Sequence, residues 1–353
     1  MFRITLQDLK FRARQFSIAV IGAGLLFAMS LLLAGMAAGF SVEITKTIDG
    51  MGANYWVLAQ GAAGRLGSLP AFPQSTLAAV AREPGVKDAA PSLVVTQPIL
   101  HDGKTTKTVN LVGYQAGSRL GGPGSLTSGH EISGPGQAVV DTALGIGLGQ
   151  QFIVADKSFD VVGITSERTL YGGVANAYVT FHDVQDAVFG GRPLISAVLV
   201  TGSPTRVPIG YVLKTNTDIA ASTLNQMKAG VASINSTRYF MWIIAAIIVA
   251  ALVYVTALQR TRDFAVLKAV GATTALLFIG LAAQAVIVSL LAALIGGVLS
   301  TFMTGLFPQP VYIPDSSYYI LPISALIVGV LASTAALRRA VSVDPAAAFA
   351  GAS

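Results

Sequence analysis

The three histidines His101, His130 and His182 are the residues of this chain best suited to acid–base or metal chemistry. They are widely separated and have no short ligand spacing such as His-x-x-x-His, so their pattern does not indicate a metal site. The absence of cysteine from the sequence excludes thiol catalysis and cysteine-based metal sites. The Gly-x-Ser-x-Gly elbow of serine hydrolases is also missing. We therefore expect no catalytic, metal or cofactor site, and we interpret the histidines as surface or loop residues.

The sequence contains no phosphate-binding loop of the kind found in ATPases. A phosphate-binding loop requires Gly-x-x-x-x-Gly-Lys-Ser/Thr. The glycine-rich stretch 61–68 lacks that lysine, and no other segment matches. If ATP drives this protein, we expect ATP and magnesium to be bound by a partner chain.

The segment from Gln259 to Ala272 has the most informative pattern, because apolar and charged residues alternate between two long apolar runs. Such a segment can form a short helix that docks into a groove of a partner, with Gly271 ending it in a left-handed conformation. A solvated basic loop is the alternative, and composition alone does not decide between the two. The residues that would make the docking contact are Arg260, Arg262, Asp263, Phe264, Val266, Leu267, Lys268 and Gly271.

This segment resembles the R-x-x-E/D-x-A-V-L-K-A-x-G-A signature of the MacB/FtsX-like permeases, with Asp263 in place of the more usual glutamate. The tail is similar to the C-terminal R-R-x-x-x-x-x-P pattern of that family through Arg338, Arg339 and Pro345. The stretches 83–91 and 144–164 resemble its extracytoplasmic core domain. The resemblance covers essentially the whole chain.

The resemblance implies a permease subunit of an ABC transporter. Two such chains would pair, and a dimer of cytoplasmic ABC ATPases would bind segment 259–272 as a coupling helix. Closure of the ATPases would then be transmitted mechanically across the membrane. A rival interpretation is a signal-transmitting subunit that moves no cargo and activates an extracytoplasmic partner. Amino-acid transport is a further alternative, although no hydrophilic cleft supports it, and the coupling segment argues against a passive anchor.

Two clusters of apolar residues could contact cargo or a second copy of the chain. Methionines seven residues apart lie roughly on one helix face, and a small-xxx-small pair allows close helix approach. The ordinary interpretation is that methionines fill gaps and aromatic residues form an interfacial belt. The alternative is a lateral pocket for an amphipathic cargo such as a lipid or drug, or haem, since the chain also resembles haem-exporter permeases. The candidate residues are Met29, Gly35, Met36, Gly39, Tyr239, Phe240, Met241 and Trp242.

The elements that must position these residues are apolar helices. The chain is 53% hydrophobic and 11% charged, well below the charge content of soluble domains. Uncharged stretches of about 20 residues or more can cross a bilayer as helices. We predict an α-helical membrane protein with four transmembrane helices and an inserted α+β extracytoplasmic domain of the MacB-like core type. The predicted segments are an interfacial helix at 1–15, transmembrane helices at 16–40, 239–258, 274–301 and 318–337, an extracytoplasmic domain at 41–238, a coupling segment at 259–273, an outer loop at 302–317 and a cytoplasmic tail at 338–353.

The distribution of charge predicts the orientation. The net charge is +6, and its excess lies in residues 1–15, 260–268 and the tail, whereas 302–317 has no Lys or Arg. By the positive-inside rule, both termini are expected in the cytoplasm of a multi-pass protein of the cell (inner or plasma) membrane. The same distribution indicates contact with membrane lipids and not with nucleic acid. The first apolar run is longer than a signal-peptide core, so we expect it to be retained.

The extracytoplasmic domain is expected to combine short strands with a few helices, and the glycine-rich stretch 117–136 is expected to be an exposed loop. The predicted strands are 55–58, 92–100, 105–114, 137–141, 152–155, 159–164, 177–181 and 197–201, and the predicted helices are 75–82, 182–189 and 216–237.

Overall fold

The computed structural model describes residues 13–62, 66–259, 263–264, 266, 268, 270–307 and 309–340 of the 353-residue chain. It forms two compact units. The unit that contains residues 39–230 is called the sheet domain below, and the rest of the chain is called the helical unit. The predicted interfacial helix at 1–15 lies almost wholly outside the described residues.

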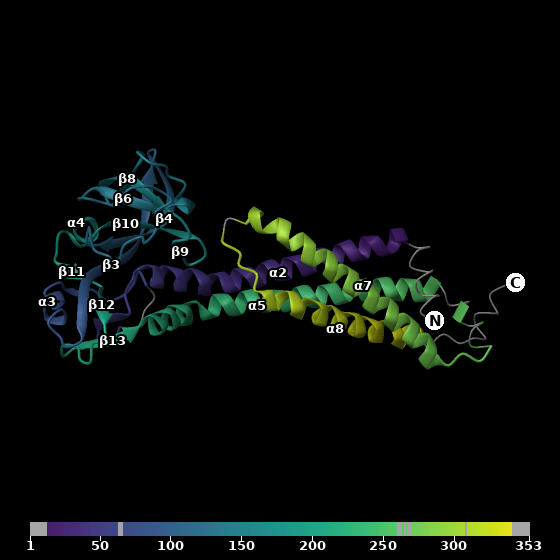
Figure 1. Cartoon of the computed structure of the whole chain (residues 1–353). Helices are drawn as coiled ribbons and strands as arrows, with labels where there is room; N and C mark the ends of the chain where they lie inside the picture. Colours follow the sequence, from purple (N-terminus) through teal and green to yellow (C-terminus); the bar gives the residue numbers. More distant parts are fainter. Residues whose placement is uncertain are drawn as a thin grey trace. The chain divides into compact units, whose positions relative to one another are not determined.

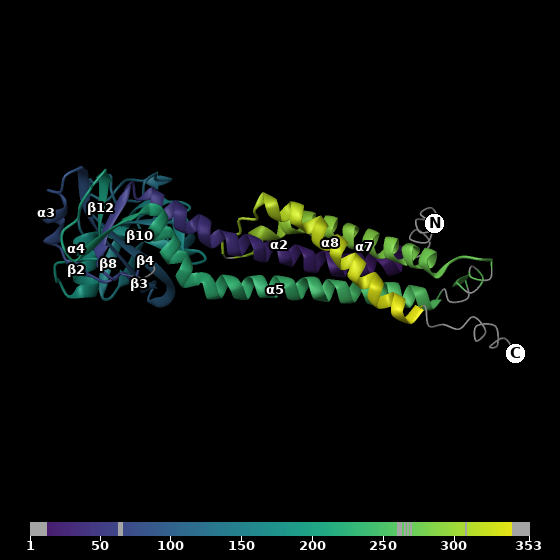
Figure 2. The same cartoon turned by 90° about the horizontal axis from the view of Figure 1, so that it is seen from below.

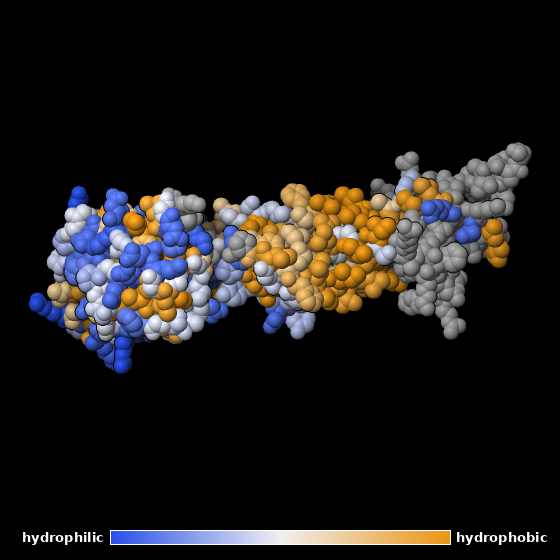
Figure 3. Space-filling model, turned by 90° about the horizontal axis from the view of Figure 1, so that it is seen from above, coloured by the Kyte–Doolittle hydropathy of each residue, from blue (hydrophilic) through white to orange (hydrophobic). Residues whose placement is uncertain are grey.

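Long apolar helices dominate the chain (Figure 1). They are α2 (Ala13–Gly50), α5 (Asn216–Gln259), α7 (Thr274–Met303) and α8 (Asp315–Ala340). In the described part of the chain, four helices are long and apolar enough to cross a membrane. Apolar side chains gather on the surface over these helices, as lipid contact requires (Figure 3). The protein is therefore a membrane protein.

Small residues set the spacing of the helices in the helical unit. A Cβ added at Gly296 of α7 would lie 2.7 Å from the carbonyl oxygen of Gly24 on α2. A Cβ at Gly329 of α8 would lie 2.8 Å from Cα of Val286 on α7, and these two helices pack side by side (Figures 1 and 2). Glycine is therefore required at both crossings, which is how membrane helices gain contact in the absence of a hydrophobic driving force.

The sheet domain is built on one large mixed sheet with the strand order β13-β1-β12-β3-β4-β10-β6-β8-β5. Most neighbours are antiparallel, but β10 is parallel to β4 and β8 is parallel to β6. Helix α4 (Phe181–Phe189) packs against β4 and β10, and the shorter α3 spans Thr76–Val80. The strands are β1 (Tyr55–Ala59), β2 (Phe72–Pro73), β3 (Val86–His101), β4 (Lys104–Tyr114), β5 (Ser128–Gly129), β6 (Gln137–Asp141), β7 (Gln151–Val154), β8 (Lys157–Thr165), β9 (Thr169–Leu170), β10 (Val174–Thr180), β11 (Leu194–Ile195), β12 (Ala197–Gly202) and β13 (Tyr211–Thr215).

The last turns of α2 form part of the core of the sheet domain. Ile44 and Ile48 of α2, and Met51 directly after it, are almost fully buried and pack in the same cluster as Trp56 of β1 and Tyr178 of β10. The sequence predicts a helix end near residue 40, but α2 continues to Gly50. The helix persists because its apolar residues at i and i+4 are buried by the sheet domain.

Other differences from the sequence expectation are local. The predicted helices 216–237 and 239–258 form the single helix α5. The turn between β7 and β8 consists of Ala155 and Asp156, both with positive φ, as in a two-residue hairpin turn, rather than residues 156–158. The stretch 117–136 is only partly exposed, because Leu120 is buried in the core of the sheet domain.

Candidate functional site

The described residues of the coupling segment are helical as far as Lys268. Asp263, Phe264, Val266 and Lys268 are helical, and the N–H of Val270 donates to the carbonyl of Val266 at 3.0 Å. The turn then ends at Gly271.

The end of this helical turn and the start of α7 are closely spaced. Gly271 has a φ of +101° and donates from its N–H to the Lys268 carbonyl at 3.0 Å, in agreement with the predicted helix end. Thr273 then accepts a hydrogen bond from the N–H of Leu276, which caps α7. The backbone around the segment is therefore fixed on its α7 side.

The side chains of the coupling segment separate into a packed and an exposed set. Phe264 is half-buried against the core of the helical unit. Val266 and Val270 are 49% and 83% exposed, and their i, i+4 spacing places them on one helix face. An exposed apolar face between charged residues suits docking of a helix into a groove.

Part of the predicted contact set falls outside the described part of the chain. Arg260, Arg262 and Leu267 lie outside the described residues, as does Pro345 of the tail. Arg338 and Arg339 are described only as backbone at the end of α8.

A buried polar cluster holds the end of α2 within the sheet domain. Glu43 is 2% exposed; its Oε1 accepts from Thr169 Oγ1 and its Oε2 from the N–H of Gly172, both at 2.9 Å. The hydroxyl of Thr47 donates to the Thr169 carbonyl at 3.0 Å. Every carboxylate oxygen of this buried acid is therefore hydrogen-bonded, as the cost of burying a charge requires.

Arg168 completes this cluster. Its Nη1 donates to the carbonyl of Lys46 at 2.9 Å and its Nε to the carbonyl of Pro123 at 3.1 Å, while its backbone N–H donates to Asp141. A Cβ added at Gly50 would lie only 2.7 Å from Cζ of Arg168, so the guanidinium packs directly against this glycine. We call Glu43, Thr47, Asp141, Arg168 and Thr169 the α2 clamp.

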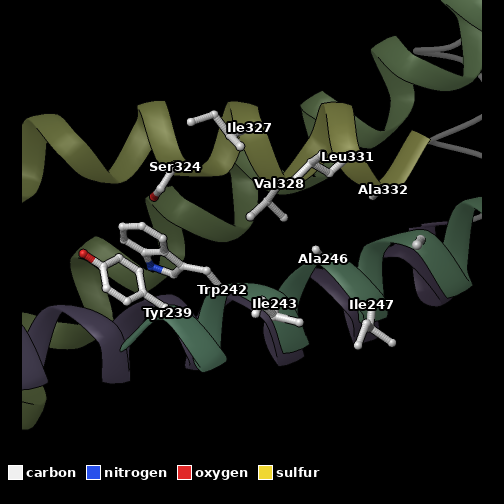
Figure 4. Close-up of a pocket in the computed structure, with 11 residues that line it drawn as sticks. Tyr239, Trp242, Ile243, Ala246, Ile247, Ser324, Ile327, Val328, Leu331 and Ala332 are labelled. Carbon is white, nitrogen blue, oxygen red and sulfur yellow. The ribbon is translucent and has the colours of Figure 1, made fainter. Parts of the chain in front are cut away.

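An apolar groove lies between α5 and α8 in the helical unit (Figure 4). Its volume is about 410 Å³, within the range of small-molecule sites. The rings of Tyr239 and Trp242 meet edge to face at 5.6 Å, and Trp242 Nε1 donates to Ser30 Oγ on α2 at 2.9 Å. The residues that line this α5–α8 groove are Tyr239, Trp242, Ile243, Ala246, Ile247, Ala250, Ser324, Ile327, Val328, Leu331 and Ala332.

The residues predicted to contact cargo or a second copy do not all lie at one site. Only Tyr239 and Trp242 of that set line the α5–α8 groove. The other wall is α8, which the sequence did not single out because its apolar residues do not differ from lipid-facing ones. The methionines Met29 and Met36 are half-buried on α2 and do not line it, nor do Phe240 and Met241 of α5.

The two glycines of the small-xxx-small pair lie in different units, Gly35 in the helical unit and Gly39 in the sheet domain. Gly35 is covered by its own chain. A Cβ there would lie 2.5 Å from Val311 and 2.8 Å from Ile313, and its carbonyl accepts from the N–H of Tyr312 at 3.1 Å. The close approach that this glycine allows is therefore made to the loop before α8.

The histidines make local contacts. His101 Nδ1 and His130 Nδ1 lie 2.8 Å from the carbonyls of Gln151 and Glu131, and the His182 ring lies against Phe181. Among the described residues, no three His, Cys, Asp or Glu side chains form a group that could hold a metal ion.

Comparisons with known proteins cover nearly the whole chain. The MacB-like periplasmic core domain matches residues 17–219, and the FtsX-like permease C-terminal region matches residues 236–345. The chain is 40% identical over 354 residues to an uncharacterized ABC transporter permease of Mycobacterium tuberculosis strain H37Rv, covering 99% of this chain and 100% of the relative.

More distant similarities are also found. A protein of Staphylococcus epidermidis RP62A, provisionally named the hemin transport system permease HrtB, is 23% identical, with 98% of each chain covered. Among solved structures, the periplasmic region of MacB from Actinobacillus actinomycetemcomitans is similar, with a TM-score of 0.36 and 16% identity over 52% of this chain and 98% of that chain.

Proposed function

The chain belongs to the MacB/FtsX-type family of ABC transporter permeases, and from that premise we propose that it transmits force from an ATPase to drive export of an amphipathic molecule, or its extraction from the membrane. Relatives in this family are permease subunits and not themselves enzymes, and the family implies an ATPase partner. We propose that two copies pair, with both termini on the side of the ATPase.

The α2 clamp is the observation that carries this proposal. Helix α2 is unbroken over 38 residues, yet its last turns, from Gly39, belong to the sheet domain. A shift or rotation of the apolar part of α2 would act directly on the buried Glu43 and its partners. Pulling this carboxyl group away from its donors would leave buried polar groups unsatisfied, at a cost of about 1–3 kcal/mol each. The clamp would therefore move with the helix.

The proposed point of entry for the force is the coupling segment. Val266 and Val270 present an exposed apolar face, while Phe264 packs on the core of the helical unit. Closure of the ATPases would push on this face, and Phe264 and the capped start of α7 would pass the displacement to the helices.

The α5–α8 groove supports an amphipathic cargo. Its lining is almost entirely apolar, and Tyr239 and Trp242 give one end aromatic rings of the kind found at membrane interfaces. A relative named for hemin transport keeps haem among the candidate cargoes, beside lipids and drugs. Export rather than import is proposed because the lining of the α5–α8 groove is almost entirely apolar and so suits a molecule that partitions into the membrane.

The experiment is reconstitution of the chain and its ATPase in lipid, with a screen for amphiphiles that stimulate ATP hydrolysis and leave the vesicle. Arg168→Gln should keep basal ATP hydrolysis but lose cargo-stimulated hydrolysis and export, because the clamp would be loosened. The exposed Arg192→Gln on the sheet domain is the matched control. Unchanged export in the Arg168 variant would contradict the mechanical path.

A further inference from the structure

Beyond the proposed transport cycle, we propose that the α5–α8 groove binds an anionic membrane phospholipid, with an acyl chain in the groove and the phosphate at Arg238. This site would exist whether or not the cargo is a lipid. The groove is open along its side and has an unusual cation at one end.

The groove is open to the side of the helices. Ile243 and Ile247 on the α5 wall are 55% and 61% exposed, and Ile327 and Leu331 on the α8 wall are 52% and 57% exposed. These rims belong to helices that can span a membrane, so lipid tails are the medium around them. An acyl chain moving from bulk lipid into the groove therefore gains little from the hydrophobic effect, and a preference for one lipid must come from the head group.

Arg238 lies at the N-terminal end of the α5 wall. The groove residues of α5 follow helical spacing from Tyr239 onward, and Asn235, four residues earlier, continues the same face. Arg238 Nη1 donates to Asn235 Oδ1 at 3.0 Å, which holds the guanidinium toward that face. Long side chains on a helix also point toward its N-terminus, which at Arg238 is the direction away from the apolar wall.

The hydrogen-bonding capacity of Arg238 is largely unused. Its Nε is buried without a hydrogen-bond partner, and among the described residues it forms no ion pair. A buried polar atom of this kind indicates a missing partner, because most such atoms in folded proteins are satisfied. A guanidinium offers two parallel N–H donors that match a phosphate.

A cation with unused donors at one end of an apolar groove is complementary to an anionic amphiphile. Phosphatidylglycerol carries a net negative charge, whereas the phosphate of phosphatidylcholine is neutralised by its own choline. Arg238 should therefore favour the anionic lipid. Two aromatic rings beside it, Tyr239 and Trp242, are of the type that gathers at head-group level.

Trp242 provides a built-in reporter for the test. The chain has two tryptophans, and the other, Trp56, is fully buried in the sheet domain. The full chain is placed in bilayers that contain phosphatidylglycerol or phosphatidylcholine with brominated acyl chains, and quenching is measured as a function of lipid fraction. We expect a preference of about tenfold for the anionic lipid, as one charge-assisted interaction supplies. The preference should be absent in Arg238→Gln and retained in Arg238→Lys.

Two control variants test whether the preference depends on Arg238 in particular and whether the lipid occupies the groove. Lys228→Gln removes an exposed cation from the same helix and should leave the preference unchanged. Ala246→Phe should fill the groove and reduce quenching by both lipids, while thermal unfolding confirms that each variant is folded. Equal quenching by the two lipids in the wild type would overturn the proposal. Absence of quenching by either would also overturn it, because the groove would then be covered by protein, such as a second copy of the chain.

Discussion

Glu43 near the end of α2 and Thr169 on β9 are 126 residues apart, yet Thr169 Oγ1 donates to Glu43 Oε1 at 2.9 Å in a buried site. The contact joins a helix that begins as an apolar span to the strands of the sheet domain. A carboxylate in this position can be stable only while all its donors stay in place. Loss of this contact should therefore lower the stability of the sheet domain and weaken the proposed transmission of force.

Glu43→Leu should destabilise the sheet domain by about 2–4 kcal/mol, because it leaves the Thr169 hydroxyl and the Gly172 N–H unsatisfied. Thermal unfolding of the full chain in detergent, followed through Trp56 fluorescence, measures this loss. The control is Glu167→Gln, which removes the exposed 2.9 Å ion pair with Lys46 and should cost less than about 1 kcal/mol. Equal effects of the two substitutions would show that the buried cluster is not stabilising.

Gly296→Ala should weaken packing in the helical unit by about 1–3 kcal/mol, because its new methyl group would meet the Gly24 carbonyl at 2.7 Å. Gly280→Ala, on the same helix, is the matched control, since nothing lies within 4 Å of the added Cβ. That control should be neutral or slightly stabilising through helix propensity. Midpoints of thermal unfolding in one detergent compare the two, and a lower midpoint for Gly280→Ala would contradict this assignment of the crossing.

The sequence predicts those parts of the fold that depend on local pattern. The apolar runs locate the membrane helices, and β6 has the predicted bounds, 137–141. The left-handed Gly271 was also expected, because a glycine after an amphipathic turn commonly ends a helix. Composition alone did not decide whether segment 259–272 is a docking helix or a solvated loop, and the family signature favoured the docking helix.

The clamp and the groove could not be predicted in the same way. Glu43 follows an uncharged run, so the sequence places it at the start of the extracytoplasmic domain, whereas its partner Thr169 lies on a strand more than a hundred residues later. On α8, Ile327 and Leu331 line the groove but have the same residue types as lipid-facing positions. The sequence suggests that Gly35 could contact a second helix. The fold shows instead that residues 311–313 of the same chain cover it.

Lys157 should make the stability of the sheet domain depend on alkaline pH. Burial alone would lower the pKa of Lys157, but hydrogen bonds to Asp183 and Asp186 and their charges outweigh it and raise the pKa. Because the folded pKa is above the unfolded value of about 10.4, the stabilisation is complete below that pH and is lost as the pH rises through the folded value. Unfolding by denaturant, followed by Trp56 fluorescence at pH 8 to 11.5 (roughly the range that brackets a lysine pKa), measures it.

Lys157→Met should remove this part of the pH dependence and lower stability at pH below about 10. It leaves Asp183, whose side chain is 1% exposed and lies 2.8 Å from the Lys157 ammonium, without its cation. Lys87→Met, at an exposed position of the same domain, is the control and should retain the wild-type profile. A parallel decline of both variants with pH would mean that other groups cause the dependence.

Val266→Glu should weaken binding of the ATPase partner by roughly tenfold or more, because it places a charge in the apolar face that we propose to dock. Val266 is 49% exposed, so the substitution should not alter the fold of the chain. Val266→Ala retains apolar character and serves as the control. Co-purification with the ATPase and titration of its stimulated hydrolysis provide the two measurements.

Phe264→Ala separates docking from transmission at the same segment. Phe264 packs on the core of the helical unit, so its loss should leave the ATPase able to bind but unable to move the helices. ATP hydrolysis should persist while export falls, the reverse of the Val266→Glu result, in which binding is lost first. If Phe264→Ala and Val266→Glu gave the same loss of binding, the two side chains would lie on one docking surface. Phe264 could then not be the residue that passes force from the segment to α2, α5 and α7.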